Sequence, residues 1–179
     1  ARARNDWPRA FAYVGRYAPE KSLDMLIEAY QIYRTRVSDP WPLITCGKGP
    51  LAPLLRGDGI RDLGFQQPSA LPDLLSRAGV FVFPSRYEPW GVALVEACAA
   101  GMPVIVTSAC GAAVECVRDG FNGFVVPPDD RAALTESLVR AHHAYDDLPE
   151  MGARSLTFAA PYSAHEWAKR WSHILHRAR

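Results

Sequence analysis

The sequence predicts an α/β fold in which helices cover both faces of a parallel sheet, as in Rossmann-like domains. Short apolar runs alternate along the chain with longer helical patterns, which is typical of successive βαβ units. Several of these runs end at a glycine or a serine, where the backbone can turn toward the next helix. The chain has 179 residues, 49% of them hydrophobic and 22% charged, which is enough for one domain with a substantial core.

The first half of the chain contains three predicted strands, each followed by a glycine. Gly15, Gly47 and Gly64 stand directly after these apolar runs, and glycine suits sharp turns. An amphipathic pattern between the first two strands predicts a long helix, and shorter apolar patterns predict two more. The expected strands are 10–14, 43–46 and 60–63, and the expected helices are 23–37, 51–55 and 71–77.

The second half repeats the alternation of strands and helices. Its first strand is apolar at every position and stops at Pro84, which cannot donate a hydrogen bond within a sheet. Gly91 then begins an apolar helix. The expected strands are 80–83, 104–106 and 123–126, and the expected helices are 91–100, 113–117 and 131–144.

A last helix is expected at 164–178, with an apolar stripe on one side. Trp167, Trp171, Ile174 and Ala178 recur at helical spacing along it. Such a stripe must cover something. Packing on its own domain is the default expectation, and docking on an absent partner domain is the alternative.

Composition and charge exclude several classes of protein. A formal net charge of +1 leaves no field that would attract nucleic acid. The four cysteines form no C-x-x-C pair, so we expect free thiols in a reducing cytosol and a cytoplasmic location. No apolar run reaches the roughly 18 residues of a membrane span, and no leader is expected at the start. The five histidines lack a set of co-ligands, so no metal site is expected.

Small and polar residues are expected to meet at one edge of the sheet. Gly15, Gly47, Gly64 and Ser85 each follow a predicted strand, and the carboxyl ends of parallel strands share one edge. Open sheets of this kind bind their ligands in the crevice beyond that edge. We therefore expect the functional site there.

The helix expected at 91–100 carries one charge, Glu96, and is otherwise apolar around its circumference. Such a helix is expected to be buried, and a buried carboxylate needs a hydrogen-bonding partner. That partner is either a ligand or a buried arginine or hydroxyl of the protein. The unpaired N–H groups near Gly91, Val92 and Ala93 would form a phosphate site at the start of the helix.

Five short motifs occur in one order between Tyr13 and Pro128. They are Gly15-Arg16 with Glu20-Lys21, Gly47-Lys48-Gly49-Pro50, Pro84-Ser85, the E-x7-E pair Glu88 and Glu96, and Ala100-Gly101-Met102-Pro103-Val104. In this order the motifs resemble the C-terminal, donor-binding domain of a retaining glycosyltransferase of family 4, which has the GT-B fold. The E-x7-E pattern alone is weak, whereas the ordered set with a Pro-Ser strand end is specific.

The resemblance implies catalytic roles for three residues. Arg16 and Lys21 match the two cations that bind the diphosphate of a nucleoside diphosphate sugar and stabilise it as it leaves. Glu88 matches the loop glutamate that contacts hydroxyls of the donor sugar. No metal ion and no cofactor besides the donor substrate is implied.

The resemblance also implies a wider set of donor-binding residues. Glu96 matches the glutamate that accepts hydrogen bonds from the ribose hydroxyls. Gly47 and Gly49 permit a tight turn beside the nucleotide, and the backbone at 64–66 corresponds to the strand end that meets the base. The donor-binding residues implied are Gly15, Gly47, Gly49, Gly64, Phe65, Gln66, Ser85, Pro89, Trp90, Gly91, Val92, Ala93 and Glu96.

By the same resemblance, residues 1–179 form a single nucleotide-sugar-binding domain of a larger enzyme. A complete GT-B enzyme also has an N-terminal acceptor domain, so this chain alone is expected to bind donor but transfer poorly. The expected partners are a UDP or GDP sugar, an acceptor glycan, lipid or small molecule, and the N-terminal domain, on which the helix at 164–179 would pack. The product would be a polysaccharide, a lipopolysaccharide or a glycolipid.

Four positions depart from the commonest pattern of that family. Ser22 stands where glycine usually follows the lysine, and Ala112 stands where a second glycine is usual. Pro89-Trp90 replaces Gly-Phe after the first glutamate. This last change stiffens and enlarges the loop nearest the sugar, so it is expected to affect which donor fits.

Other functions stay open as alternatives. Glu88 and Glu96 are disfavoured as the acid and nucleophile of a glycosidase, because eight residues of helix rise ~12 Å whereas such pairs lie about 5 to 9.5 Å apart. An epimerase or a phosphorylase of the same fold is one alternative, and a non-catalytic nucleotide-binding module is another.

The basic residues of the last helix are expected to form a solvated face. Peripheral contact with the inner face of a membrane is the alternative for this face. The residues are Lys169, Arg170, Arg177 and Arg179.

Overall fold

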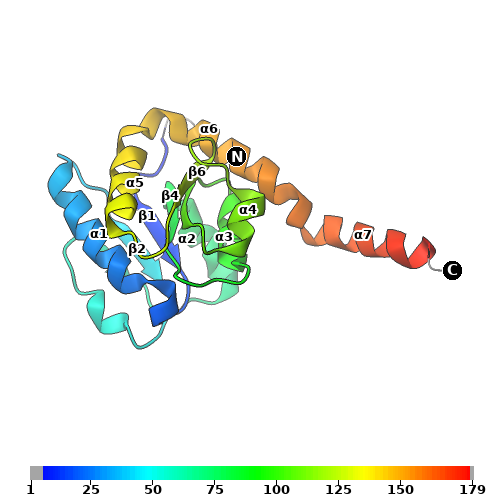
Figure 1. Ribbon diagram of the computed structural model, residues 1–179, viewed down its shortest axis with the longest axis horizontal. Coiled ribbons are helices and arrows are strands. Elements are labelled where there is room, and N and C mark those ends of the chain that lie inside the picture. Colours follow the sequence, from blue (N-terminus) through cyan, green and yellow to red (C-terminus); the bar gives the residue numbers. More distant parts are fainter. Residues whose placement is uncertain (1–5, 178–179) are drawn as a thin grey trace.

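A computed structural model describes residues 6–177 and confirms the predicted α/β fold. Six parallel strands form one sheet in the order β3-β2-β1-β4-β5-β6, with helices on both faces (Figure 1). The strand order reverses between β1 and β4, and ligands of open sheets bind beyond such a reversal. The strands are β1 (Phe11–Val14), β2 (Leu43–Cys46), β3 (Ile60–Asp62), β4 (Val80–Phe83), β5 (Val104–Thr107) and β6 (Gly123–Val126).

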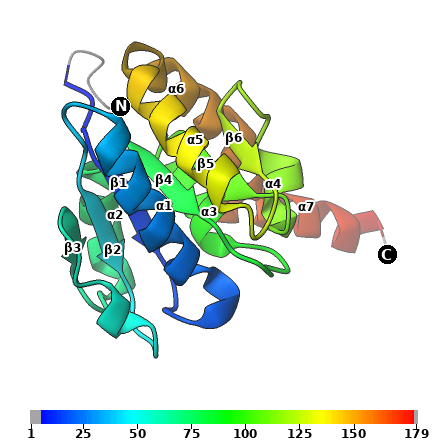
Figure 2. The same cartoon turned by 60° about the vertical axis from the view of Figure 1, so that its left-hand side comes forward.

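Helices connect and follow these strands. In Figure 2, α1 and α5 lie side by side on one face of the sheet, while α3 packs against α6 on the other. The α-helices are α1 (Leu23–Arg36), α2 (Leu71–Ser76), α3 (Val92–Ala99), α4 (Gly111–Cys116), α5 (Arg131–His143), α6 (Leu148–Ala159) and α7 (Ala164–Arg177). The 3-10 helices are η1 (Pro19–Lys21), η2 (Ala52–Leu54), η3 (Pro68–Ala70), η4 (Tyr145–Asp147) and η5 (Ala160–Tyr162).

Two helical segments differ from the sequence prediction. Residues 51–55 contain only the short 3-10 helix η2. The sequence does not predict α6, because Pro149 and Gly152 interrupt its pattern. In the structure Pro149 lies in the first turn, where its missing N–H costs nothing. Gly152 allows close packing, since a Cβ there would lie 2.2 Å from the carbonyl oxygen of Gly101.

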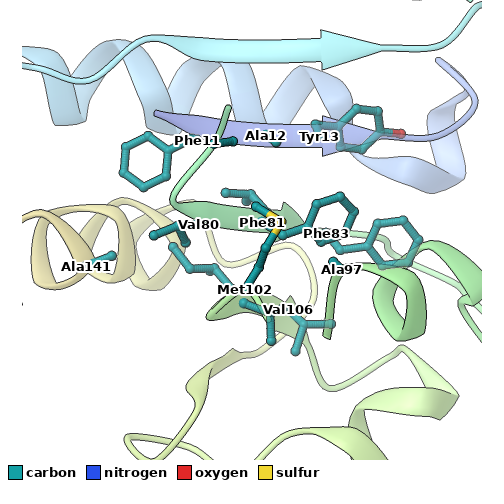
Figure 3. Close-up of a cluster of buried hydrophobic side chains, with 14 of the residues drawn as sticks. Phe11, Ala12, Tyr13, Val80, Phe81, Phe83, Ala97, Met102, Val106 and Ala141 are labelled. Atoms are coloured by element: carbon teal, nitrogen blue, oxygen red, sulfur yellow. The ribbon is translucent and has the colours of Figure 1, made fainter. Parts of the chain in front are cut away.

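An aromatic core joins the two central strands. The ring of Phe11 on β1 meets Tyr33 of α1 edge-on with centroids 5.2 Å apart, and Phe81 and Phe83 of β4 stack at 5.8 Å. Figure 3 shows the side chains of β1 beside those of β4 in this core. Burying each such side chain contributes about 1.5–3 kcal/mol. The core therefore fixes the two strand ends from which the expected site is built.

Helix α7 extends away from the rest of the molecule (Figure 1). Trp167, Trp171 and Ile174 are 59%, 47% and 55% exposed. The default expectation that this stripe packs on its own domain is therefore wrong, because the bend at η5 directs α7 away from the sheet. Ala178, the last member of the predicted stripe, lies outside the described residues. The exposed stripe is free to meet another surface.

The four cysteines are buried free thiols, as expected. Burial raises the pKa of Cys98 to about 12 and that of Cys110 to about 11, so both are protonated at neutral pH. Among the described helices, none has both the length and the apolar character that crossing a membrane requires.

Candidate functional site

The carboxyl edge of the sheet brings the predicted glycines into one row. The N–H of Gly15 donates to the last residue of β2 over 3.0 Å, and the N–H of Gly47 donates to the carbonyl of Gly64 over 2.9 Å. A Cβ at residue 47 would lie 1.9 Å from the carbonyl oxygen of Gly15, so only glycine fits there. A Cβ at Gly49 would lie 2.4 Å from the carbonyl oxygen of Tyr17. The tight turn is confirmed, and its contact with a nucleotide stays a prediction.

Lys21 and Glu88 form an ion pair at this edge although they lie 67 positions apart in the chain. The Nζ of Lys21, in η1 after β1, donates to Oε2 of Glu88, in the loop after β4. Their side chains are only 11% and 14% exposed. Because β1 and β4 are neighbours in the sheet, the segments that follow them meet. The pairing leaves neither buried charge uncompensated.

The loop after β5 and the first turn of α4 support the loop that carries Glu88. The N–H of Gly111 donates to the carbonyl of Glu88 over 3.0 Å, and the N–H of Ala112 donates to the carbonyl of Trp90 over 2.8 Å. The Sγ of Cys110 donates to the same Trp90 carbonyl over 3.1 Å. These bonds fix the backbone from Glu88 to Trp90 and leave the Trp90 side chain 40% exposed.

Helix α3 begins beside the ion pair. Gly91 precedes it with φ of 105°, and a Cβ there would lie 2.6 Å from the Sγ of Cys110. The N–H groups of Val92 and Ala93 lie in the first turn, where a helix offers no internal acceptor. The structure thus brings the predicted phosphate-binding amides next to Lys21, and anion binding there stays a prediction.

Glu96 is exposed, which contradicts the expectation of a fully buried α3. Among residues 6–177, no element covers the outer face of this helix. Within residues 6–177, no hydrogen bond or ion pair involves the Glu96 side chain, so the alternative of a buried structural pair is wrong. The core-facing residues are Leu94, Ala97 and Cys98, and the outward-facing residues are Val92, Glu96 and Ala99.

Two hollows flank Glu96 on the surface. One of about 390 Å³ lies between α3 and the corner of α6 and η5, and includes Leu156 and Tyr162. The other, of about 330 Å³, lies between α3 and α2, and includes Leu71 and Leu75. Glu96 is the single charged residue that lines either hollow. This carboxylate can accept hydrogen bonds from hydroxyls of a ligand that also has apolar parts.

Arg16 lies at the same edge but outside the ion pair of Lys21. Its guanidinium pairs with Glu20 over 2.6 Å, and its side chain is 71% exposed. The hydroxyl of Tyr13 donates to the Arg16 carbonyl over 2.7 Å and fixes its backbone. Burial raises the pKa of Tyr13 well above its usual value, so this hydroxyl keeps its proton. Because an exposed ion pair is worth less than about 1 kcal/mol, the guanidinium can turn to a ligand at little cost.

The end of β3 presents an exposed aromatic ring. Phe65 is 55% exposed, and the Nζ of Lys48, which follows β2, lies 4.9 Å from its ring centroid. Gln66 is held by a bond from its Nε2 to the carbonyl of Leu63 over 2.7 Å. These residues lie together at the edge beyond β2 and β3, where the resemblance expects the base, and that contact stays a prediction.

Ser22 and Ser85 are buried hydroxyls without a hydrogen-bond partner among the described residues. Ser22 adopts the left-handed conformation, with φ of 54°, at the start of α1. Glycine adopts this conformation without strain, so the glycine that is usual at this position in the family would fit it better than Ser22 does. Ser85, after β4, is fully buried.

No sequence motif includes a prediction for Arg86, whose guanidinium bonds to Asp24, Asp129 and Pro19 near the ion pair. Its carboxylate partners lie 62 and 43 positions away in the chain. No local pattern therefore indicates the contacts.

Within residues 6–177, no three side chains of histidine, cysteine, aspartate or glutamate lie close enough to hold a metal ion. The site offers a buried ammonium, an exposed guanidinium, the first amides of a helix and two carboxylates that can accept hydroxyl hydrogen bonds. This set suits a ligand that carries both phosphate and hydroxyl groups.

Comparison with known proteins identifies one family. The family described as "Glycosyl transferases group 1" matches residues 2–155. The chain is 31% identical over 164 residues to the alpha-D-kanosaminyltransferase of Streptomyces kanamyceticus, covering 87% of this chain and 41% of that protein. It is 34% identical over 176 residues to a D-inositol 3-phosphate glycosyltransferase of Salinispora tropica, covering 87% of this chain and 35% of the relative. The chain thus spans about two fifths of the length of these curated relatives.

A solved structure matches the fold over nearly the whole chain. The pneumococcal O-GlcNAc transferase GtfA, in complex with UDP and GlcNAc, superposes with a TM-score of 0.85 at 21% identity. The match covers 98% of this chain and 37% of that one. At this identity the match establishes the shared architecture.

Proposed function

This chain belongs to the group 1 glycosyl transferases, and we propose that it is the donor-binding domain of a retaining glycosyltransferase of family 4 with the GT-B fold. The observation that carries the proposal is the ion pair of Lys21 and Glu88 beside the start of α3. It combines a cation for a diphosphate with a carboxylate for sugar hydroxyls in one place. Membership of this family favours transfer over the epimerase, phosphorylase and non-catalytic alternatives.

The donor would lie along the carboxyl edge from the end of β3 to the start of α3. Lys21 and the first amides of α3 would bind the diphosphate, and Arg16 would swing from Glu20 to join them. Glu88 would bind sugar hydroxyls, and the exposed, unpaired Glu96 would accept the ribose hydroxyls. The base would then meet the backbone near Phe65.

These groups would favour departure of the diphosphate. As the bond from the anomeric carbon to the diphosphate oxygen breaks, negative charge grows on the leaving group. Two cations fixed near that charge stabilise it more than they stabilise the bound donor. The acceptor hydroxyl would attack on the same face, which retains the configuration, and its proton would pass to the departing diphosphate oxygen, without a protein nucleophile or a metal ion.

The remaining part of the enzyme would supply the acceptor site. The relatives are more than twice as long as this chain, which supports an additional N-terminal domain. The exposed stripe of α7 would give that domain a docking surface, because the described residues leave Trp167 and Trp171 largely exposed. We expect this chain alone to bind donor and to transfer poorly.

The donor nucleotide is proposed to be UDP or GDP. UDP is the first one to test, because the pneumococcal transferase of the same fold contains it. A glycan, lipid or small molecule would serve as acceptor, in polysaccharide, lipopolysaccharide or glycolipid synthesis. The enzyme would act in the cytoplasm, with the basic residues of α7 available for peripheral contact with the inner face of a membrane.

Calorimetric titration of this chain with UDP, GDP and ADP tests the proposal. We expect one nucleotide to bind, with the same affinity in EDTA and in magnesium. Lys21→Ala and Glu96→Ala should each weaken binding at least tenfold, since each removes a charge-assisted contact worth about 1.5–3 kcal/mol. Lys169→Ala on α7 and Glu136→Ala on α5 are matched controls away from the site, and should bind like the wild type.

Binding that is unchanged in Lys21→Ala and Glu96→Ala would contradict the assigned site. Failure of both this chain and the longer protein to bind any of the three nucleotides would contradict the proposed function. In the longer protein, loss of transfer in Glu88→Gln with nucleotide binding intact would separate an enzyme from a binding module.

A further inference from the structure

Arg86 ties together three segments at the carboxyl edge of the sheet. Its Nη1 donates to the carbonyl of Pro19 over 2.7 Å, and its Nη1 and Nη2 donate to the two carboxylate oxygens of Asp24 over 3.0 and 3.1 Å. Its Nε donates to Asp129 over 2.5 Å. Pro19 and Asp24 belong to the segment after β1, Arg86 follows β4, and Asp129 follows β6. One guanidinium thus joins the ends of three strands.

Backbone hydrogen bonds also link the segments that contain Arg86 and Glu20, close to the ion pair. The N–H of Arg86 donates to the carbonyl of Glu20 over 2.9 Å, and the N–H of Tyr87 reaches the same oxygen over 3.4 Å. Glu20 is adjacent to Lys21 in the chain, and Glu88 is two residues beyond Arg86. The segments that present Lys21 and Glu88 are therefore bonded to each other through Arg86 and its backbone.

The contacts of Arg86 form a network rather than a single surface ion pair. Its side chain is 32% exposed, and two carboxylates and a carbonyl surround it. Burial opposes the ionisation of Asp24, but the bonds from Arg86 lower the pKa of Asp24 below its usual value, so the pair is charged at neutral pH. The two parallel bonds to Asp24 also fix the plane of the guanidinium.

We propose that Arg86 is a positioning residue, which sets the spacing of Lys21 and Glu88 for the donor. This inference rests on the proposed function. Arg86 acts through the two segments and makes no bond to Lys21 or Glu88 itself. Lysine cannot replace it, because a compact ammonium cannot bond both oxygens of Asp24 in one plane while it also reaches Asp129 and Pro19.

The test compares Arg86→Lys and Arg86→Gln with the wild type. The dissociation constant for UDP is measured by calorimetry at a temperature where circular dichroism shows every variant folded. We expect binding about tenfold weaker in both variants, because a misplaced Lys21 or Glu88 loses most of its charge-assisted contact with the donor. Arg36→Gln is the matched control, since Arg36 pairs with Glu136 over 2.9 Å at the far end of α1.

A purely structural role would give a different result. Arg86→Lys would then lower the melting temperature and leave the dissociation constant within twofold of the wild type, as expected for Arg36→Gln. That result would overturn the proposal. If the Arg86 variants do not fold, Asp129→Asn replaces them, because it weakens one contact and leaves Arg86 in place. We expect this variant to bind UDP about threefold more weakly than the wild type.

Hydrogen exchange gives a second measurement that needs no ligand. In Arg86→Lys, amide exchange should accelerate together in residues 16–24 and 86–91, while α5 keeps its protection. Unchanged exchange in either segment would overturn the proposal. If neither the wild-type chain nor the longer protein binds a nucleoside diphosphate, the proposed function fails, and the exchange result alone decides whether Arg86 joins the two segments.

Discussion

The carboxyl edge of the sheet and helix α7 differ in how far their side chains find partners within the described chain. At the edge, Lys21 is paired with Glu88 and Arg86 is bonded to Asp24, so the charged groups are held in place before any ligand arrives. On α7, large apolar side chains such as Trp171 stand in solvent. The charged groups of the edge find partners among the described residues, whereas the apolar stripe of α7 is left exposed by them.

The largest expected effect compares two tryptophans in these unlike environments. Trp41, after α1, is 4% exposed and stacks on His142 with ring centroids 4.8 Å apart. We expect Trp41→Ala to lower the free energy of unfolding by about 3–5 kcal/mol. Trp171→Ala on α7 should change it by less than about 0.5 kcal/mol. Urea unfolding measures both, and equal losses would show that α7 is packed in solution.

The next effect concerns the paired charges of the edge. Lys21→Met leaves the carboxylate of Glu88 without its partner, and both side chains are less than 15% exposed. We expect a loss of about 2–3 kcal/mol, slightly below the value for a fully buried pair. The double variant Lys21→Met/Glu88→Gln should recover at least half of that loss. A double-mutant cycle in urea measures the coupling, and purely additive losses would contradict the pairing.

A smaller effect tests the strain at the start of α1. Ser22 is left-handed and its buried hydroxyl has no partner among the described residues. Ser22→Gly should therefore raise the free energy of unfolding by about 1 kcal/mol. Ser22→Ala removes the hydroxyl but keeps the strained backbone, so it should gain less. Thermal unfolding of the pair measures the difference, and a gain from alanine equal to that from glycine would assign the effect to the hydroxyl alone.

The smallest expected effect is the pH dependence of stability that arises from the pair of Arg86 and Asp24. The pKa of Asp24 is lowered in the folded state from the ordinary value of 3.8. Its contribution to stability is therefore complete above that value and is lost as the pH falls through the lower, folded-state pKa. Asp24→Asn should show a weaker loss of stability below pH 3.8 than the wild type. Parallel curves for the two proteins would contradict this assignment.

Much of the fold could be predicted because its signals are local. The apolar runs at β2 and β4 are bounded by Cys46-Gly47 and Phe83-Pro84, so their ends agree with the structure. Helix α6 escapes prediction because Gly152 is used for close packing on Gly101, a contact made 51 positions away in the chain. Tertiary packing there overrides a poor helical sequence.

The site was less predictable, since its key contacts join distant segments. The motifs indicate Lys21 and Glu88 as site residues, but the ion pair between them depends on β1 and β4 being neighbours in the sheet. The burial expected for Glu96 was wrong, because an apolar helix surface predicts that something covers it but does not show what. Among the described residues, no element covers the face of α3 that carries Glu96. Arg86 carries no local signal, because its role arises from loops that meet only in the folded chain.

Because the strand order reverses between β1 and β4, the site forms only when both halves of the sheet come together. Strands β3, β2 and β1 come from the first part of the chain and β4, β5 and β6 from the second, so Lys21 and Glu88 are contributed by different parts. Neither part alone contains the ion pair. Cleavage at the exposed Gln67 would yield two complementary fragments, and the ion pair of Lys21 and Glu88 would form again only after they recombine across β1 and β4. The ion pair thus reports whether both halves of the sheet have joined.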